Sequence, residues 1–250
     1  MPNTILAILA HPDDAEFLCA GTLIRLIREH GCTVHIASMT PGDCGSVEYS
    51  PQEISRIRRE EGARAARRIG ASYHCVEERD LLVCYNEHTL EKVTRLFRHV
   101  QPSIVLTHSP SDYILDHEMT STLARAAAFA APIPNFLADR RIGSVLPRIP
   151  HLYYCDAIEG KDPLGRDVVP GFRVDITGVI EEKALMLADH ASQRDWLMKH
   201  HGMDHYVHSM RELGTKRGGE MGVAFAEGFR QHLGHSYPQD NVVATLLDAN

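Results

Sequence analysis

Three side chains that bind metal ions or transfer protons, His11, Asp13 and Asp14, lie close together in the stretch A-H-P-D-D-A-E at 10–16. A histidine and an aspartate three residues apart can reach one cation from a loop, and imidazole and carboxylate ligands suit zinc. A catalytic zinc usually has three protein ligands and one open position, so a third ligand is needed. His117 is the best candidate, because it follows another apolar run in a second loop rich in His and Asp.

A lone His and Asp pair more often caps a helix or satisfies a loop than binds a metal. Here a second carboxylate, Asp13, joins the pair, and the loop at 108–117 repeats the pattern. A metal site is therefore the favoured interpretation.

Asp13 has a different expected role from Asp14, because the side chains of successive residues diverge. It can instead reach a metal-bound water. Zinc lowers the pKa of that water towards neutrality, and a nearby carboxylate takes its proton as it attacks a carbonyl carbon. Metal-assisted hydrolysis of an amide or ester, with Asp13 as general base, is the reaction class that this arrangement indicates.

The elements that position these residues alternate between strands and helices. Buried strands are predicted at 5–10, 33–39, 72–76, 103–107, 151–155 and 172–176. Helices are predicted at 17–27, 52–69, 89–100, 118–131 and 177–190. This alternation predicts an α/β fold whose mostly parallel sheet is covered on both faces, with ligands bound at the carboxyl ends of the strands. We expect a single domain over 1–250, with 191–250 as a C-terminal extension that lines or covers the site.

Composition excludes several other classes of protein. The formal net charge of -7 argues against a general nucleic-acid binder. No apolar run approaches the roughly 18 residues of a transmembrane helix, and the start lacks a signal-peptide pattern. The six cysteines are scattered without a C-x-x-C pair, which favours reduced thiols and a cytoplasmic location.

The stretch at 10–16, followed by G-T-L at 21–23, resembles the signature of the LmbE-like, or PIG-L, family of zinc-dependent de-N-acetylases. Further segments similar to that family lie at 57–70, 102–117, 183–193 and 226–230. The resemblance implies a Rossmann-like three-layer α/β sandwich and a homo-oligomer, hexamers being known in the family. It also implies that His11, Asp14 and His117 hold one zinc ion and that Asp13 is the general base.

One position departs from the family pattern. Many members carry a second histidine three residues before the last ligand, where it polarises the carbonyl or protonates the leaving amine. Here Ile114 occupies that position, and isoleucine can donate neither a hydrogen bond nor a proton. His190, His201 and His205 are the candidates for the missing proton donor.

Two further residues have open roles. Arg58, in the segment that resembles the family's Arg/Glu helix, is expected either to contact the oxyanion or substrate or to form a surface salt bridge. Asp116 is expected to orient a ligand imidazole or to shape its loop. The glycine-containing loop at 40–46 is either a wall of the pocket or only a turn.

The expected function is removal of an acyl group, acetyl first, from an N-acylated amine, with an amino sugar or its conjugate as the leading substrate. An amidase acting on a non-sugar amide or a thiol conjugate is one alternative. A catalytically degenerate metal-binding or regulatory protein is another, and the Ile114 substitution is the only sign of it. A non-haem iron oxygenase shares the ligand types, but the alternation of strands and helices disfavours it.

Overall fold

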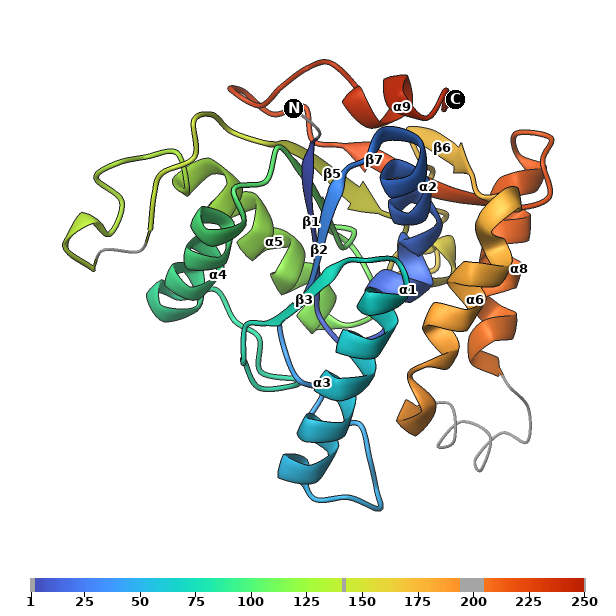
Figure 1. Cartoon of the computed structure of the whole chain (residues 1–250), viewed down its shortest axis with the longest axis horizontal. Coiled ribbons are helices and arrows are strands. Elements are labelled where there is room, and N and C mark those ends of the chain that lie inside the picture. The colour runs from blue at the N-terminus through green and yellow to red at the C-terminus, as the bar shows by residue number, and fades with distance from the viewer. Residues whose placement is uncertain (1–2, 141–142, 194–204, 250) are drawn as a thin grey trace.

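The computed structural model describes residues 3–140, 143–193 and 205–249. These residues form a seven-stranded sheet in the order β3-β2-β1-β4-β5-β7-β6, which Figure 1 shows between layers of helices. The strands are β1 (Thr4–Leu9), β2 (Thr33–Ser38), β3 (Ser72–Cys75), β4 (Ile104–Thr107), β5 (His151–Cys155), β6 (Phe172–Asp175) and β7 (Ala226–Gln231). The first five strands pair in parallel, and β7 runs antiparallel to β5 and β6. The predicted α/β fold with a mostly parallel sheet is confirmed.

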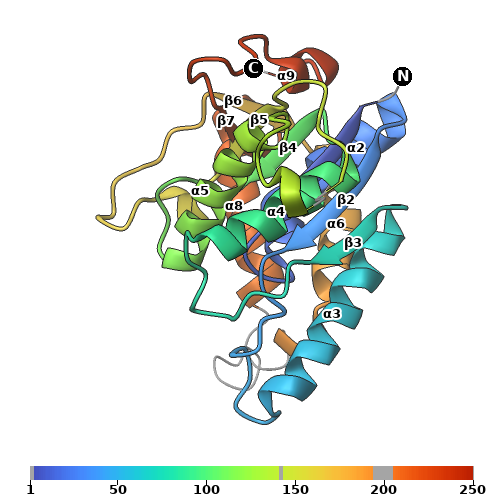
Figure 2. The ribbon, with the colours of Figure 1, turned by 90° about the vertical axis from the view of Figure 1, so that its left-hand side faces the viewer.

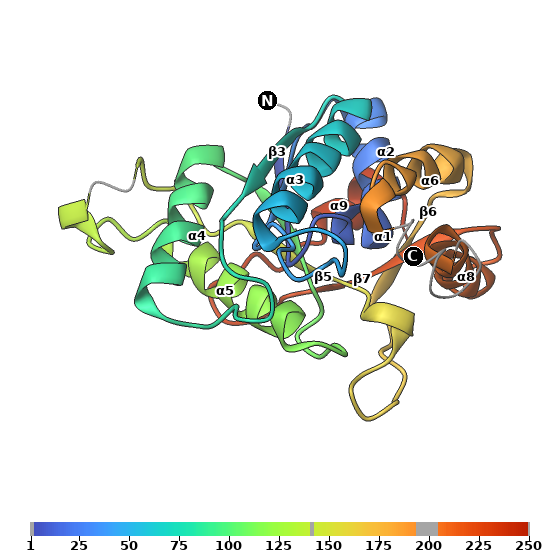
Figure 3. The ribbon, with the colours of Figure 1, turned by 90° about the horizontal axis from the view of Figure 1, so that it is seen from below.

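Helices cover both faces of the sheet. The view in Figure 2 looks onto the layer that contains α4 (Glu87–Val100) and α5 (Leu115–Ala130). The other layer, seen beside it in Figure 3, is built mainly by α1 (Asp14–Leu18), α2 (Ala20–His30), α3 (Pro51–Arg68) and α6 (Ile180–Ala188). Helix α8 (His205–Gly219) packs against β7, and α9 (Val242–Leu246) packs against β6. Short 3-10 turns lie at Ala138–Arg140 (η1), Ile158–Gly160 (η2) and Thr177–Val179 (η3).

Two apolar cores, one on each face, hold the layers together. Ile5, Ala7 and Leu9 of β1 face the core under α1, α2 and α6, whereas Leu6 and Ile8 face the core under α4 and α5. All five side chains are fully buried, as expected for a strand inside a doubly covered parallel sheet.

The place of β1 in the sheet determines where the candidate site lies. β1 pairs with β2 on one side and with β4 on the other, both in parallel. The chain adds β2 and β3 on one side of β1 and then β4 and β5 on the other side, so the order of strand addition reverses between β1 and β4. Ligands of open α/β sheets bind at such a reversal, outside the carboxyl ends of the strands. The loops that follow β1 and β4 both open at this point.

Three elements differ in detail from the prediction. Helix α5 begins at Leu115, so His117 lies in its first turn and not in the preceding loop. The predicted helix at 17–27 is divided at Cys19, whose φ of -142° is not helical. β7, which the sequence analysis did not predict, lies between β5 and β6.

Strand β7 was not predicted because a buried polar residue, Glu227, interrupts its apolar pattern. Its Glu227 accepts hydrogen bonds from the backbone N–H groups of Gly21 (2.9 Å) and Thr22 (2.8 Å) at the start of α2. The Glu227 carboxylate also pairs with Lys183 Nζ at 2.6 Å. A buried carboxylate in a strand thus serves a neighbouring helix, which a local pattern does not reveal.

Within the described ranges 3–140, 143–193 and 205–249, no helix combines the length and the apolar character needed to cross a membrane.

Candidate active site

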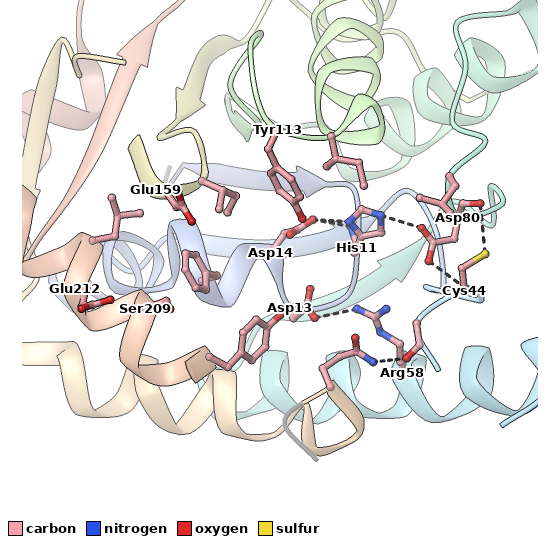
Figure 4. Close-up of a pocket in the computed structure, with 18 of the residues that line it drawn as sticks. His11, Asp13, Asp14, Cys44, Arg58, Asp80, Tyr113, Glu159, Ser209 and Glu212 are labelled. Carbon is pink, nitrogen blue, oxygen red and sulfur yellow. Dashed lines mark hydrogen bonds and ion pairs between the residues drawn. The ribbon is translucent and has the colours of Figure 1, made fainter. Parts of the chain in front are cut away.

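A cleft of about 840 Å³ lies at the carboxyl end of the sheet, beside the loop that follows β1 (Figure 4). Its walls come from the loops after β1, β2, β3 and β4, from α1 and α3, from η2 and from α8. The lining residues are His11, Asp13, Asp14, Phe17, Cys44, Gly45, Arg58, Asp80, Leu81, Tyr113, Ile114, Ile158, Glu159, Gln193, Tyr206, Ser209, Glu212, Leu213 and Lys216. The single-domain organisation stays a prediction, but the described part of 191–250 does contribute α8 to the cleft.

The three predicted metal ligands are brought together. Asp14 Oδ2 lies 3.3 Å from His11 Nδ1 and 3.6 Å from His117 Nε2. Two ligands of one tetrahedral zinc, each bonded at roughly 2.0–2.2 Å, are about 3.4 Å apart. Both ring nitrogens of His117 are buried without a hydrogen-bond partner, which is costly unless a cation uses one of them. The three side chains therefore fit one divalent ion.

Two other groups of His and Asp in the described chain also have ligand atoms close together. One is His108, Asp112 and His117, and the other is His11, Asp80 and Asp116. None of the first group lines the cleft, so an ion there would have no position open to substrate. The second group would bind an ion through the other ring nitrogen, His11 Nε2, which lies 3.1 Å from Asp80 Oδ1 and 3.4 Å from Asp116 Oδ2, and Asp116 does not line the cleft.

The backbone at Asp13 sends the two adjacent carboxylates in different directions. Its φ of 114° lies in the left-handed region, which costs a non-glycine residue of order 1–3 kcal/mol. Helix α1 starts directly afterwards, at Asp14. Figure 4 shows Asp14 directed towards His11, whereas Asp13 is directed towards Arg58.

The two carboxylates also have opposite proton affinities. Burial raises the pKa of Asp13, with a further increase from the Asp14 charge, and Arg58, His190 and Tyr206 offset only part of this. Burial also acts to raise the pKa of Asp14, but the His117 and His108 imidazoles hold it well below its usual range. Adjacent acids whose pKa values are pushed apart are typical of a base next to a ligand or stabilising group.

Arg58 lies inside the protein, beside Asp13. Its side chain is buried, and Arg58 Nη2 is 2.9 Å from Asp13 Oδ2 and 2.8 Å from the Pro12 carbonyl oxygen. A Cβ atom at Gly42 would lie 2.2 Å from the guanidinium, and one at Gly45 would lie 2.5 Å from it. The ion pair between Arg58 and Asp13 is thus buried and not on the surface. The glycine-containing loop at 40–46 forms a wall of the pocket and leaves space for the Arg58 guanidinium.

Asp116 lies beside His11 and not beside the ligand on its own helix, His117. Its Oδ2 is 3.4 Å from His11 Nε2, and Asp80 Oδ1 is closer, at 3.1 Å. Asp116 also accepts the backbone N–H of Leu81 at 2.7 Å. Its position is compatible with both expected roles, orienting an imidazole and shaping a loop.

Three residues near the ligands, His108, Asp112 and Asp80, were not predicted as part of the site. Asp112 Oδ2 lies 3.3 Å from His117 Nδ1. His108 stacks on the His117 ring at 3.7 Å, and its Nε2 is 3.0 Å from Asp14 Oδ2. Burial and the neighbouring His117 lower the pKa of His108 to about 4. His108 and Asp112 could have been found from their place after β4, but the third residue, Asp80, has no local motif.

The predicted proton donors are only partly described. His190 is completely buried, does not line the cleft, and has its Nε2 3.5 Å from Glu16 Oε2. His205 is the first residue of α8, and its side chain is not described; His201 lies outside the described residues.

Two tyrosines in the cleft were missed by the sequence analysis. Tyr113 directly precedes Ile114, and its ring meets that of His117 edge-on at 5.3 Å. Its hydroxyl is directed towards Asp14 in Figure 4. Tyr206, from α8, also lines the cleft, and its interaction with the Asp13 carboxylate lowers the pKa of Asp13. Both phenols are polar groups that can donate a hydrogen bond inside the cleft.

Comparison with known proteins bears on the family and the fold of this chain. Residues 6–128 match the family PIG-L: GlcNAc-PI de-N-acetylase. The N,N'-diacetylchitobiose deacetylase from Pyrococcus horikoshii superposes with a TM-score of 0.77 and 26% identity, over 95% of this chain and 87% of that one. A 4-oxalmesaconate hydratase from Pseudomonas putida is 27% identical over 232 residues, or 90% of this chain and 84% of the relative.

A solved hydratase structure also shares the fold. The 4-carboxy-2-hydroxymuconate hydratase from Pseudomonas putida has a TM-score of 0.75 and 22% identity, over 96% of this chain and 99% of that one. These relatives are enzymes, both deacetylases and hydratases. The resemblance to the PIG-L, or LmbE-like, family that the A-H-P-D-D-A-E stretch predicts is confirmed over residues 6–128.

Proposed function

We propose that this protein is a zinc-dependent hydrolase that removes an acyl group, acetyl first, from an N-acylated amine. An amino sugar or its conjugate is the leading substrate class, and a non-sugar amide or thiol conjugate is the next. The observation that carries the proposal is the divergence of the two adjacent carboxylates: Asp14 faces His11 and His117, whereas Asp13 has a raised pKa in the cleft. This is the arrangement that hydrolysis by an activated water needs.

The metal would be held by His11, Asp14 and His117, and when bound it would acidify water and polarise the acyl oxygen. Asp13 takes the proton of the attacking water, and its raised pKa favours this transfer near neutral pH. Arg58, 2.9 Å from Asp13, holds that carboxylate in place. Asp13 then returns the proton to the leaving amine as the C–N bond breaks.

Tyr113 is the group we assign to the role that is vacant at Ile114. It lines the cleft and is next to the vacant position in sequence, whereas His190 is buried behind Asp13 and does not line the cleft. Tyr113 is 66% exposed, and a phenol with its ordinary pKa of about 10 keeps its proton at neutral pH. It can donate a hydrogen bond to the developing oxyanion.

A hydratase is the second candidate, because the 4-oxalmesaconate hydratase covers most of this chain at 27% identity. Its name denotes a carboxylate substrate. The described lining carries the carboxylates Asp13, Asp14, Asp80, Glu159 and Glu212 but only two Lys or Arg cations, Arg58 and Lys216. Arg58 is already paired with Asp13. A polyanionic substrate would meet repulsion, so the lining favours the hydrolase.

A direct assay separates the two functions. The zinc-loaded protein is incubated with N-acetylated amino sugars and simple N-acetyl amines, and released amine is measured. In parallel, loss of ultraviolet absorbance reports water addition to a conjugated unsaturated dicarboxylate. Amine release without hydration supports the hydrolase, and hydration without amine release overturns it.

A further inference from the structure

We propose that Asp80 is a positioning residue that fixes the His11 imidazole for metal binding and joins it to the loop that seats Arg58. The inference rests on the proposed function for its catalytic meaning. Asp80 lies in the loop that follows β3, and its side chain is only 6% exposed.

The first step concerns the proton on His11. His11 Nε2 faces two carboxylate oxygens, Asp80 Oδ1 at 3.1 Å and Asp116 Oδ2 at 3.4 Å. His11 Nδ1 lies 3.3 Å from Asp14 Oδ2, so Nδ1 is the nitrogen that would bind the ion. With Nδ1 bound in this way, Nε2 carries the ring proton and donates it to an ionised carboxylate, which only accepts hydrogen bonds. Asp80 thus holds the ring in the orientation that turns Nδ1 towards Asp14.

The second step separates Asp80 from Asp116. Both Asp116 oxygens accept backbone N–H groups, from Leu81 at 2.7 Å and Val83 at 3.3 Å. Asp80 Oδ1, by contrast, has His11 as its only partner among the described hydrogen bonds. Asp80 is also the closer of the two to Nε2, so it carries the larger share of the orienting interaction.

The third step links His11 to a second loop. Asp80 Oδ2 accepts the backbone N–H of Cys44 at 3.2 Å, and the Asp80 N–H donates to Asp43 Oδ1 at 2.8 Å. Figure 4 shows Asp80 between His11 and Cys44. Both contacts hold the glycine-containing loop at 40–46 against the loop that follows β3.

The glycine-containing loop at 40–46 in turn seats the Arg58 guanidinium, which faces the proposed general base, Asp13. Gly42 and Gly45 leave the space that Arg58 occupies, and Arg58 Nη2 lies 2.9 Å from Asp13 Oδ2. One carboxylate therefore connects a metal ligand to the support of the general base. Loss of Asp80 should weaken metal binding first and the orientation of Asp13 second.

The test compares Asp80→Asn and Asp80→Ala with Asp43→Asn, a control that perturbs the same loop without touching His11. Zinc affinity is measured by competition with a chelator, and the hydrogen bond of the His11 Nε2–H is followed by its 1H and 15N shifts in the zinc-loaded protein. We expect Asp80→Asn to raise the zinc Kd about 10- to 100-fold and to weaken that hydrogen bond, which moves the Nε2–H proton shift upfield. The control should keep both properties.

Two results would overturn the proposal. Unchanged zinc affinity and an unchanged Nε2–H shift in both Asp80 variants would show that Asp80 does not orient His11. An equal loss in Asp43→Asn would show a general effect of the loop. These readouts do not depend on the substrate, so a wild-type protein that binds zinc but cleaves no N-acyl amine would reject the proposed function and leave the Asp80 result standing.

Discussion

The segments that follow β1 and β4 contribute to the candidate metal site in different ways. His11, Asp13 and Asp14 after β1 all line the cleft, whereas His108, Asp112 and His117 after β4 do not. Of the residues that follow β4, Tyr113 and Ile114 line the cleft. In the proposed function, the segment after β1 therefore provides the reacting groups, and the segment after β4 would hold the metal through the buried His117 and forms a wall of the cleft.

This difference explains why one departure from the family pattern can be tolerated. Ile114 lies where the loop after β4 reaches the cleft. An isoleucine in place of the family's histidine would therefore remove a contact with substrate and leave the buried His117 in place. The neighbouring Tyr113 can then take over the lost contact. Substitution of the buried residues after β4 should therefore strongly affect metal binding, whereas substitution of residues that line the cleft should affect turnover.

The largest effect is expected from His117→Ala. Removing the buried ligand leaves Asp14 and His11 as an incomplete set, so the variant should lose its metal and all metal-dependent turnover. Metal content after gel filtration measures this, and His88→Ala, on the surface of α4, is the control. Full zinc occupancy in His117→Ala would remove this residue from the ligand set.

His108 should make the metal-free protein sensitive to mild acid. Its pKa is about 4 in the folded state against 6.5 in a free side chain, so the unfolded chain binds a proton between these values that the folded chain does not. The free energy of unfolding should therefore fall as pH drops from about 6.5 to 4, by about 3 kcal/mol from this group.

Urea unfolding at pH 7 and pH 4.5 measures this pH dependence. His108→Gln keeps an acceptor for the Ala10 N–H, which donates to His108 Nε2 at 3.0 Å, but it cannot titrate in this range. The variant should lose stability less steeply than the parent. Equal slopes would mean that His108 is protonated as easily in the folded protein as in the unfolded chain.

A smaller effect is expected from Tyr113→Phe. If the phenol donates to the oxyanion, kcat should fall about 100-fold with little change in KM. Tyr85→Phe, an exposed tyrosine outside the cleft lining, is the matched control. An unchanged kcat in Tyr113→Phe would return the donor role to another residue.

Much of the site could be predicted because its strongest signals are local. The apolar run of β1 ends at the A-H-P-D-D stretch, and parallel strands place the loops after β1 and β4 at one edge, which is how His117 could be matched to His11. Asp80 and Tyr206 could not be found this way. They come from the loop after β3 and from α8, and only the packed fold brings them to His11 and Asp13.

The central claim is that two adjacent carboxylates do different work, and the pair Asp13→Asn and Asp14→Asn tests it most directly. Zinc content and turnover are measured on both variants. We predict that Asp13→Asn keeps its zinc and loses about 10²–10⁴-fold in kcat, whereas Asp14→Asn loses the metal. Normal turnover in Asp13→Asn, or equal zinc binding by the two variants, would contradict the account.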